Sequence, residues 1–172
     1  MTPTWDLFII IFFSLIVILG IALGRERAAV GVIASYIGLV AANVWGNAIY
    51  NILGGTSATI GENISVTANV SPFIIKTVIF AIILVLLITK GDFLKKATTY
   101  HTGILSLLTA GIYSFLNAGI IVTALISFLS EAQRTELLLQ SNLINTIVRY
   151  QTWWLVLPAI LIIILGFKHT EE

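Results

Sequence analysis

The sequence contains no cysteine and only two histidines, His101 and His169, among its 172 residues. The absence of cysteine excludes disulfides, thiolate nucleophiles, iron–sulfur clusters and cysteine-ligated zinc. Two histidines this far apart in the sequence do not have the spacing of a metal site. We therefore expect no metal and no cofactor.

Charged residues are also scarce, at 10% of the chain, whereas soluble domains have about 25%. Nine Lys and Arg against eight Asp and Glu leave a net charge of +1. The chain thus lacks the basic surface that neutralises phosphates, and we expect no nucleic-acid binding. Apolar residues make up 58% of the sequence, and the mean hydropathy is +1.04. This composition is typical of a protein whose partner is the lipid bilayer.

Long uncharged apolar runs predict an all-α polytopic membrane protein, because a transmembrane helix needs about 20 mainly apolar residues. The candidate spans are residues 5–24, 28–53, 72–89, 103–129 and 153–167. The last has 15 residues, which is about 22 Å of helix, so it crosses a bilayer only with help from the residues before it. The expected fold is a single membrane domain, 1–172, with four to five transmembrane helices.

The positions of the cationic residues predict the orientation, because cytoplasmic loops are enriched in Lys and Arg. The cations that fall on one side of the predicted membrane are Arg25, Arg27, Lys90, Lys95, Lys96 and Lys168. On the opposite side, the loop between residues 53 and 72 has none, and the segment after the fourth span has Arg134 and Arg149. We expect a multi-pass plasma-membrane protein with its N-terminus outside and its C-terminus inside.

Residues 131–150 are a candidate amphipathic helix. Ser130 and Gln133 have the spacing of a capping box, which marks the start of a helix. Apolar residues fill about half of the helical wheel, although Glu136 and Gln140 interrupt the apolar arc. The pattern favours an interfacial helix along the outer membrane surface. A plain helical extension of the neighbouring spans is the alternative.

Small residues recur at four-residue spacing in three spans, which allows two helix backbones to approach closely. They are Gly20 and Gly24 in the first span, Ala34, Gly38, Ala42 and Gly46 in the second, and Ala110, Ser114 and Ala118 in the fourth. We predict that these positions pack against other helices. The third span has no such stripe and is expected to face lipid. Trp153 and Trp154 lie near a span end, as in an interfacial aromatic belt.

Polar side chains inside the spans are the candidate functional residues. Asn43, Asn47 and Asn51 recur at every fourth position and form one stripe on the second span. This stripe predicts either hydrogen bonds between helices or a water-lined path. Asn117 lies so deep in the fourth span that we expect it to have a partner within the protein. Lys76 is expected at the outer interface with its stem in lipid, and binding of an anionic headgroup or substrate is the alternative.

Two regions of the chain follow the order of a known family. An Asp, an apolar helix, a glycine turn with Arg and a small-residue-rich helix succeed one another in WDLFIIIFFSLIVILGIALGRERAAVGVIASYIGLVAA. A Gly-rich helix and a Ser-containing amphipathic segment follow in HTGILSLLTAGIYSFLNAGIIVTALISFLS and LLLQSNLINTIV. These segments resemble the colicin V production (CvpA) family, which typically has four spans. The resemblance implies a bacterial inner-membrane protein linked to toxin production or export and envelope maintenance, with no catalytic residues to carry over.

The sequence leaves two functions open. The first is a non-enzymatic membrane protein that acts by helix–helix association, with itself or with partner membrane proteins. The second is a channel or transporter subunit with a path lined by asparagines. A membrane enzyme is not expected, because the chain has neither paired carboxylates nor a Ser, His and Asp constellation.

Overall fold

The computed structural model describes residues 5–52, 71–90 and 103–167, which are helical apart from short turns. In chain order the helices are α1 (Trp5–Leu23), α2 (Arg25–Ile52), α3 (Pro72–Lys90), α4 (Ile104–Phe128), α5 (Glu131–Gln140), α6 (Asn142–Arg149) and α7 (Gln151–Phe167). The helices α1 to α4 are long and apolar enough to cross a membrane, and α6 with α7 forms a further span if the pair, bent by 59°, is counted as one. The all-α membrane fold is confirmed. The loops that carry Lys95, Lys96 and Lys168 lie outside the described residues.

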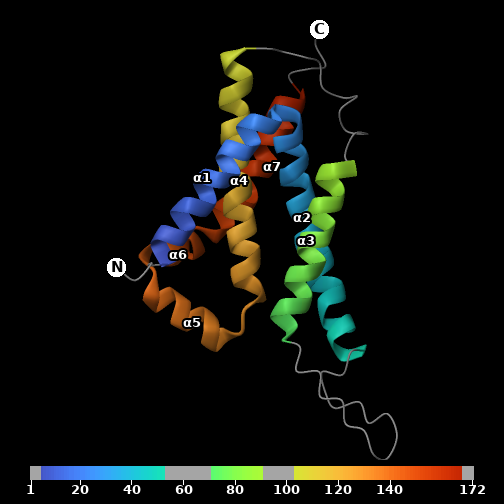
Figure 1. Ribbon diagram of the computed structural model, residues 1–172, viewed down its shortest axis with the longest axis vertical. Coiled ribbons are helices and arrows are strands. Elements are labelled where there is room, and N and C mark those ends of the chain that lie inside the picture. The colour runs from blue at the N-terminus through green and yellow to red at the C-terminus, as the bar shows by residue number, and fades with distance from the viewer. Residues whose placement is uncertain (1–4, 53–70, 91–102, 168–172) are drawn as a thin grey trace, which may run out of the picture.

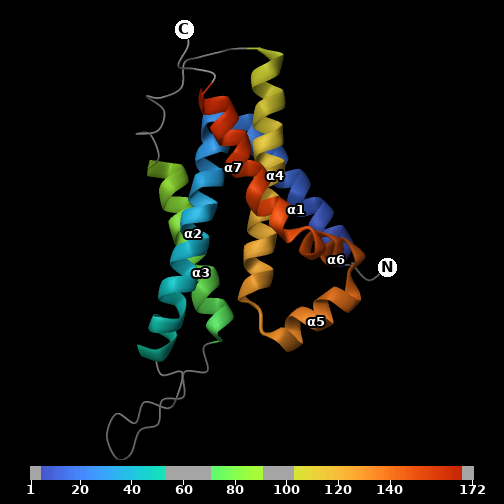
Figure 2. The same ribbon diagram turned by 180° about the vertical axis from the view of Figure 1, so that it is seen from behind.

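Helix α4 is the centre of the bundle and contacts α1, α2, α3, α6 and α7. In Figure 1, α1 rises obliquely to meet α2 at the upper end, while α2 and α3 run side by side. The reverse view in Figure 2 shows α7 crossing α4. About half of the most apolar part of α2 and α4 is buried, against 11% in α1 and α3. The outer faces of α1 and α3 therefore present apolar surface that suits lipid, and exposed apolar side chains of α2, α4 and α7 add to it.

The third span packs more than its sequence predicts. Helix α3 lies along α2, and its Phe80 is buried against Gly38 and Ala42 of α2. Ile75 of α3 is also buried. Leu86, in contrast, is about half exposed. The expectation that this helix faces lipid is thus wrong for one face and holds for the other. The reason is that the small residues of α2 create the space, so α3 needs no small residues of its own.

A single residue, Gly24, separates α1 from α2. Its φ of +86° is in the left-handed region that favours glycine. Its amide donates to the carbonyl of Gly20 at 3.0 Å, and its carbonyl accepts from the amide of Ala28 at 3.1 Å. A Cβ at position 24 would meet no atom within 4 Å. The prediction that Gly24 packs against another helix is therefore wrong, because its role is to turn the chain.

The predicted helix 131–150 is divided at Ser141. The capping box at the start of α5 is confirmed, since the Ser130 side chain accepts from the Gln133 amide and Gln133 accepts from the Ser130 amide. At the other end of α5, the hydroxyl of Ser141 accepts from the amide of Ile144 at 3.0 Å and caps the start of α6. The expectation of one continuous helix is wrong because this serine caps a new helix instead of continuing the old one.

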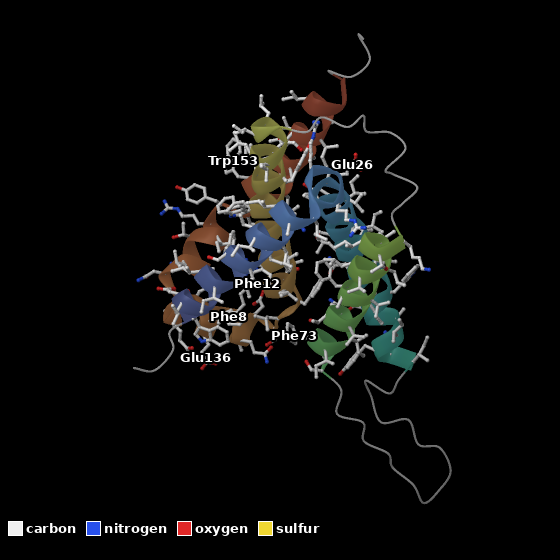
Figure 3. The ribbon with its side chains drawn as sticks, turned by 45° about the horizontal axis from the view of Figure 1, so that its top comes forward. Phe8, Phe12, Glu26, Phe73, Glu136 and Trp153 are labelled. Carbon is white, nitrogen blue, oxygen red and sulfur yellow. The ribbon has the colours of Figure 1, made fainter. Side chains whose placement is uncertain are left out.

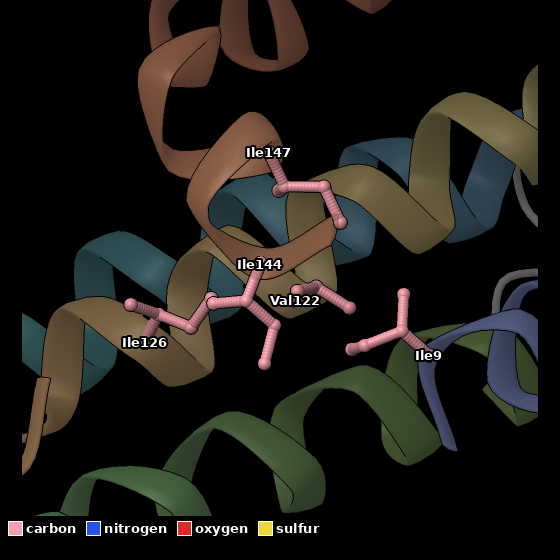
Figure 4. Close-up of a cluster of buried hydrophobic side chains, with 5 residues drawn as sticks. All are labelled: Ile9, Val122, Ile126, Ile144 and Ile147. Atoms are coloured by element: carbon pink, nitrogen blue, oxygen red, sulfur yellow. The ribbon is translucent and has the colours of Figure 1, made fainter. Parts of the chain in front are cut away.

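Three apolar clusters hold the described helices around α4, and two of them each join three helices. Figure 4 shows the first, which joins α1, α4 and α6 through Ile9, Val122, Ile126, Ile144 and Ile147. The second joins α2, α3 and α4 through Ala42, Phe80, Ile121, Ala124 and Phe128. Lipid tails are as apolar as these side chains, so close van der Waals packing is what stabilises such contacts in a membrane.

Helix α7 contains a proline close to a hydrogen bond from α2. Pro158 has no amide hydrogen and weakens the helical hydrogen bonds of the preceding turn. The hydroxyl of Tyr36 donates to the carbonyl of Leu155 in that turn, at 2.5 Å. This bond links α2 to α7 in the turn before the proline.

Candidate functional site

A buried polar pair joins α2 to α4 in the middle of the bundle. The hydroxyl of Ser35 donates to the side-chain oxygen of Asn117 at 2.7 Å, and both residues are buried. A Cβ at Gly31 would lie 3.1 Å from the Asn117 amide nitrogen, so this glycine makes room for the amide. Ser35 is thus the partner that the depth of Asn117 predicted. Ser35 itself was not among the predicted site residues, because serine is common in such helices.

The small residues of α1 and α4 meet in one close contact. A Cβ at Gly20 would overlap the side chain of Ser114. The hydroxyl of Ser114 donates to the carbonyl of Ala110, one turn earlier in α4, at 2.8 Å. It therefore turns back along its own helix and lets α1 approach, which is the packing role expected of these positions.

The small residues of α2 face α3 and α4. A Cβ at Gly38 would lie 3.0 Å from a ring carbon of Phe80, and one at Gly46 would lie 2.5 Å from Cγ of Lys76. The remaining predicted packing residues are also buried, namely Ala34, Ala42 and Ala118. The stripe on α2 thus accommodates large side chains of α3.

Lys76 rests on α2, and not in lipid as predicted. The Cγ, Cδ and Cε atoms of its stem surround the position where a Cβ of Gly46 would lie. The absence of a side chain at Gly46 leaves this groove for the stem. Lys76 is four residues after Pro72, the first residue of α3, which puts it close to one end of the bundle. The predicted position near the interface agrees with this placement, whereas the predicted environment of the stem is wrong.

The asparagine stripe of α2 faces away from the bundle. Asn43, Asn47 and Asn51 are all exposed, and none has a hydrogen-bond partner among the described residues. Hydrogen bonds to helices of a second chain and a water-lined path therefore stay predictions for this stripe, which makes no bond to another helix within the described residues. The physical reason is that the glycines and alanines of α2 allow closer packing than asparagines do, so they occupy the buried face. We call these three residues the outer amide stripe.

An aromatic cluster joins α1, α4 and α7 through Phe13, Phe115 and Trp154. The ring centroids are 5.3 to 5.9 Å apart. A Cβ at Gly119 would overlap the Trp154 ring, so the indole lies directly on the backbone of α4. Its Nε1 is buried and has no hydrogen-bond partner within the described chain. The assignment of Trp154 to an interfacial belt is wrong. Gly119 has no side chain, so the Trp154 ring packs against the backbone of α4 inside the bundle.

The start of α1 is bonded to the junction of α5 and α6. One carboxylate oxygen of Asp6 accepts from the hydroxyl of Ser141 and, at 3.2 Å, from the amide of Leu143. The indole of Trp5 donates to the side-chain oxygen of Gln140 at 2.9 Å. A carboxylate at a helix N-terminus also interacts favourably with the helix dipole. The sequence offered no signal for these bonds, which join residues about 135 positions apart.

Beside this junction is a cavity of about 440 Å³ between α1, α3, α4, α5 and the start of α6. Its apolar wall includes Phe8 and Phe12 of α1 and Phe73 of α3. Figure 3 labels these residues together with Glu136 of α5, which is also part of the lining. We call this space the α5 cavity. It is large enough for a ligand, since known pockets are about 300–1,000 Å³ in volume.

Comparison of the chain with known protein families, curated proteins and solved structures found no match.

Proposed function

We propose that this chain is a non-enzymatic membrane protein that acts by helix–helix association through the outer amide stripe of α2. The proposed setting, a bacterial inner membrane and a role in toxin production or export or in envelope maintenance, rests on the resemblance to the CvpA family. The observation that carries the association is the exposure of three carboxamides on one face of a membrane-spanning helix.

The depth of Asn43 supports the proposal. Asn43 is nine residues before the last residue of α2, which is about 13 Å of helix. The 28 residues of α2 are about 42 Å long, so a centred helix extends about 6 Å beyond a 30 Å hydrocarbon layer at each end. Asn43 then lies about 7 Å inside the hydrocarbon layer. An amide in that position needs a partner that lipid tails do not supply.

A second copy of the chain is the partner that we favour. A carboxamide both donates and accepts hydrogen bonds, so two such stripes can satisfy each other. The placement favours association over a conducting path within one chain, because the stripe faces away from the chain's own helices. For the orientation we propose an outer N-terminus and an inner C-terminus, on the distribution of Lys and Arg.

Energy transfer between labelled chains in liposomes tests the association. A single cysteine introduced at the exposed Ser14 carries the dye, since the chain has no other cysteine. We expect the parent to associate and the triple variant Asn43→Leu, Asn47→Leu, Asn51→Leu to associate about twentyfold more weakly, at about 0.6 kcal/mol for each lost hydrogen bond.

The matched control changes three exposed apolar residues of a different helix, Val78, Ile82 and Val85 of α3, to leucine. This control is expected to associate like the parent, because it adds no polar group and removes none. A parent that stays monomeric at every protein-to-lipid ratio would refute the proposal. Ion or solute flux through the parent that is lost in the triple variant would instead support the channel function.

A further inference from the structure

Helix α5 lies over the α5 cavity, and hydrogen bonds hold both of its ends. Ser130 and Gln133 cap its start, while the Trp5–Gln140 bond and the adjacent Asp6–Ser141 bond hold its end. None of its residues is buried. An amphipathic helix held in this way leaves space beneath it, between its own inner face and the helices α1 and α4.

The lining of the cavity is apolar on one side and polar on the other. Helices α1 and α4 contribute hydrocarbon and aromatic side chains, among them Phe12, Leu125 and Ile126. The polar side chains that line it all come from α5 and are Gln133, Glu136 and Gln140. Positions three and seven residues apart share one face of a helix. The cavity therefore suits an amphiphilic ligand, because its rim on α5 is polar and its floor on α1 and α4 is apolar.

Glu136 gives the rim a specific charge. Its Oε1 accepts from the side-chain nitrogen of Gln140 at 3.2 Å, and the oxygen of Gln140 accepts from the Trp5 indole. No ion pair to Glu136 exists within the described part of the chain. A carboxylate accepts several hydrogen bonds, and those from a cation are the strongest. The rim thus suits a ligand with an ammonium group.

We propose that the α5 cavity binds a membrane lipid with a primary ammonium headgroup, such as phosphatidylethanolamine. One acyl chain lies against α1 and α4, and the ammonium donates to Glu136. The apolar floor excludes a small polar amine, and the anionic rim disfavours a lipid with net negative charge. This site is independent of the outer amide stripe, because its lining comes from α1, α3, α4, α5 and α6 and includes no residue of α2.

Lipid retention in bilayer discs tests the site. The full chain is reconstituted in discs of equal parts phosphatidylethanolamine, phosphatidylcholine and phosphatidylglycerol, extracted gently, and examined by native mass spectrometry. We expect retained phosphatidylethanolamine to exceed each of the other lipids. In Glu136→Gln the preference is expected to fall about tenfold, because the charge-assisted hydrogen bond is lost while size and the bond to Gln140 are kept.

The matched control is Glu131→Gln, which removes a carboxylate from the same helix at a position outside the cavity. It is expected to keep the parent's preference. A second variant, Leu125→Phe, adds bulk to the floor and is expected to reduce retention of all three lipids. Circular dichroism and gel filtration identify any variant that fails to fold.

Three outcomes would overturn the proposal. They are equal retention of the three lipids by the parent, a preference for phosphatidylglycerol, and an unchanged preference in Glu136→Gln. Failure of the α2 variants to change association would leave this result untouched, so the two proposals can fail separately.

Discussion

The buried pair of Ser35 and Asn117 allows a quantitative test of how polar contacts stabilise the bundle. We consider a double-mutant cycle of Ser35→Ala and Asn117→Ala. Hydrogen bonds between membrane helices contribute about 0.6 kcal/mol on average and about 1.7 kcal/mol at most. The donor–acceptor distance is 2.7 Å, and Ser35 and Asn117 are 0% and 7% exposed. This geometry predicts a coupling in the upper part of the range, about 1–1.7 kcal/mol.

The assay is reversible unfolding in mixed micelles, with the free energy of unfolding measured for the parent, both single variants and the double variant. Asn117→Ala also changes packing. The cycle subtracts this effect, because Asn117→Ala is measured both with Ser35 present and with Ser35→Ala. The control is Ser14→Ala, since Ser14 is exposed and bonds only to the Ile10 carbonyl of its own helix. A coupling indistinguishable from zero, with the control also unchanged, would refute the reasoning that this pair links α2 to α4.

Further substitutions test three other parts of the structure by the same measurement. Gly38→Leu inserts bulk against α3 and is expected to lower the free energy of unfolding by about 1–3 kcal/mol. Leu86→Ala trims an exposed side chain and is expected to change it by about 0.5 kcal/mol or less. Equal losses of stability in the two variants would argue against the close contact of Gly38 with α3. Gly24→Ala is expected to cost about 1–2 kcal/mol, because alanine is strained at positive φ, and an unchanged midpoint would contradict this account of the turn. Asp6→Ala is expected to cost about 1–3 kcal/mol. Ser141→Ala removes the same link and also the cap of α6, which contributes about 1 kcal/mol. The double variant is therefore expected to lose less than the sum of the two single variants, and fully additive losses would show that the two residues act independently.

Local patterns in the sequence determined the elements of this protein. The apolar runs predicted the four long helices to within a few residues, because a helix that crosses a bilayer must satisfy its own backbone and present apolar side chains. The capping box at Ser130 and Gln133 was also readable, since its two hydrogen bonds depend only on residues three positions apart. The depth of Asn117 along its helix likewise predicted a buried partner.

The tertiary structure decided which faces meet. Gly24 and Gly38 look alike in the sequence, yet one turns the chain and the other packs against α3, because only the second has a neighbour. The outer amide stripe could equally well have faced inward, until close packing of the glycines and alanines of α2 assigned that face to them. The bonds of Asp6 to α6 depend on the path of the chain between residues 6 and 141. A helix defines the spacing of its side chains from local geometry alone, whereas the contacts of those side chains depend on how every other helix packs.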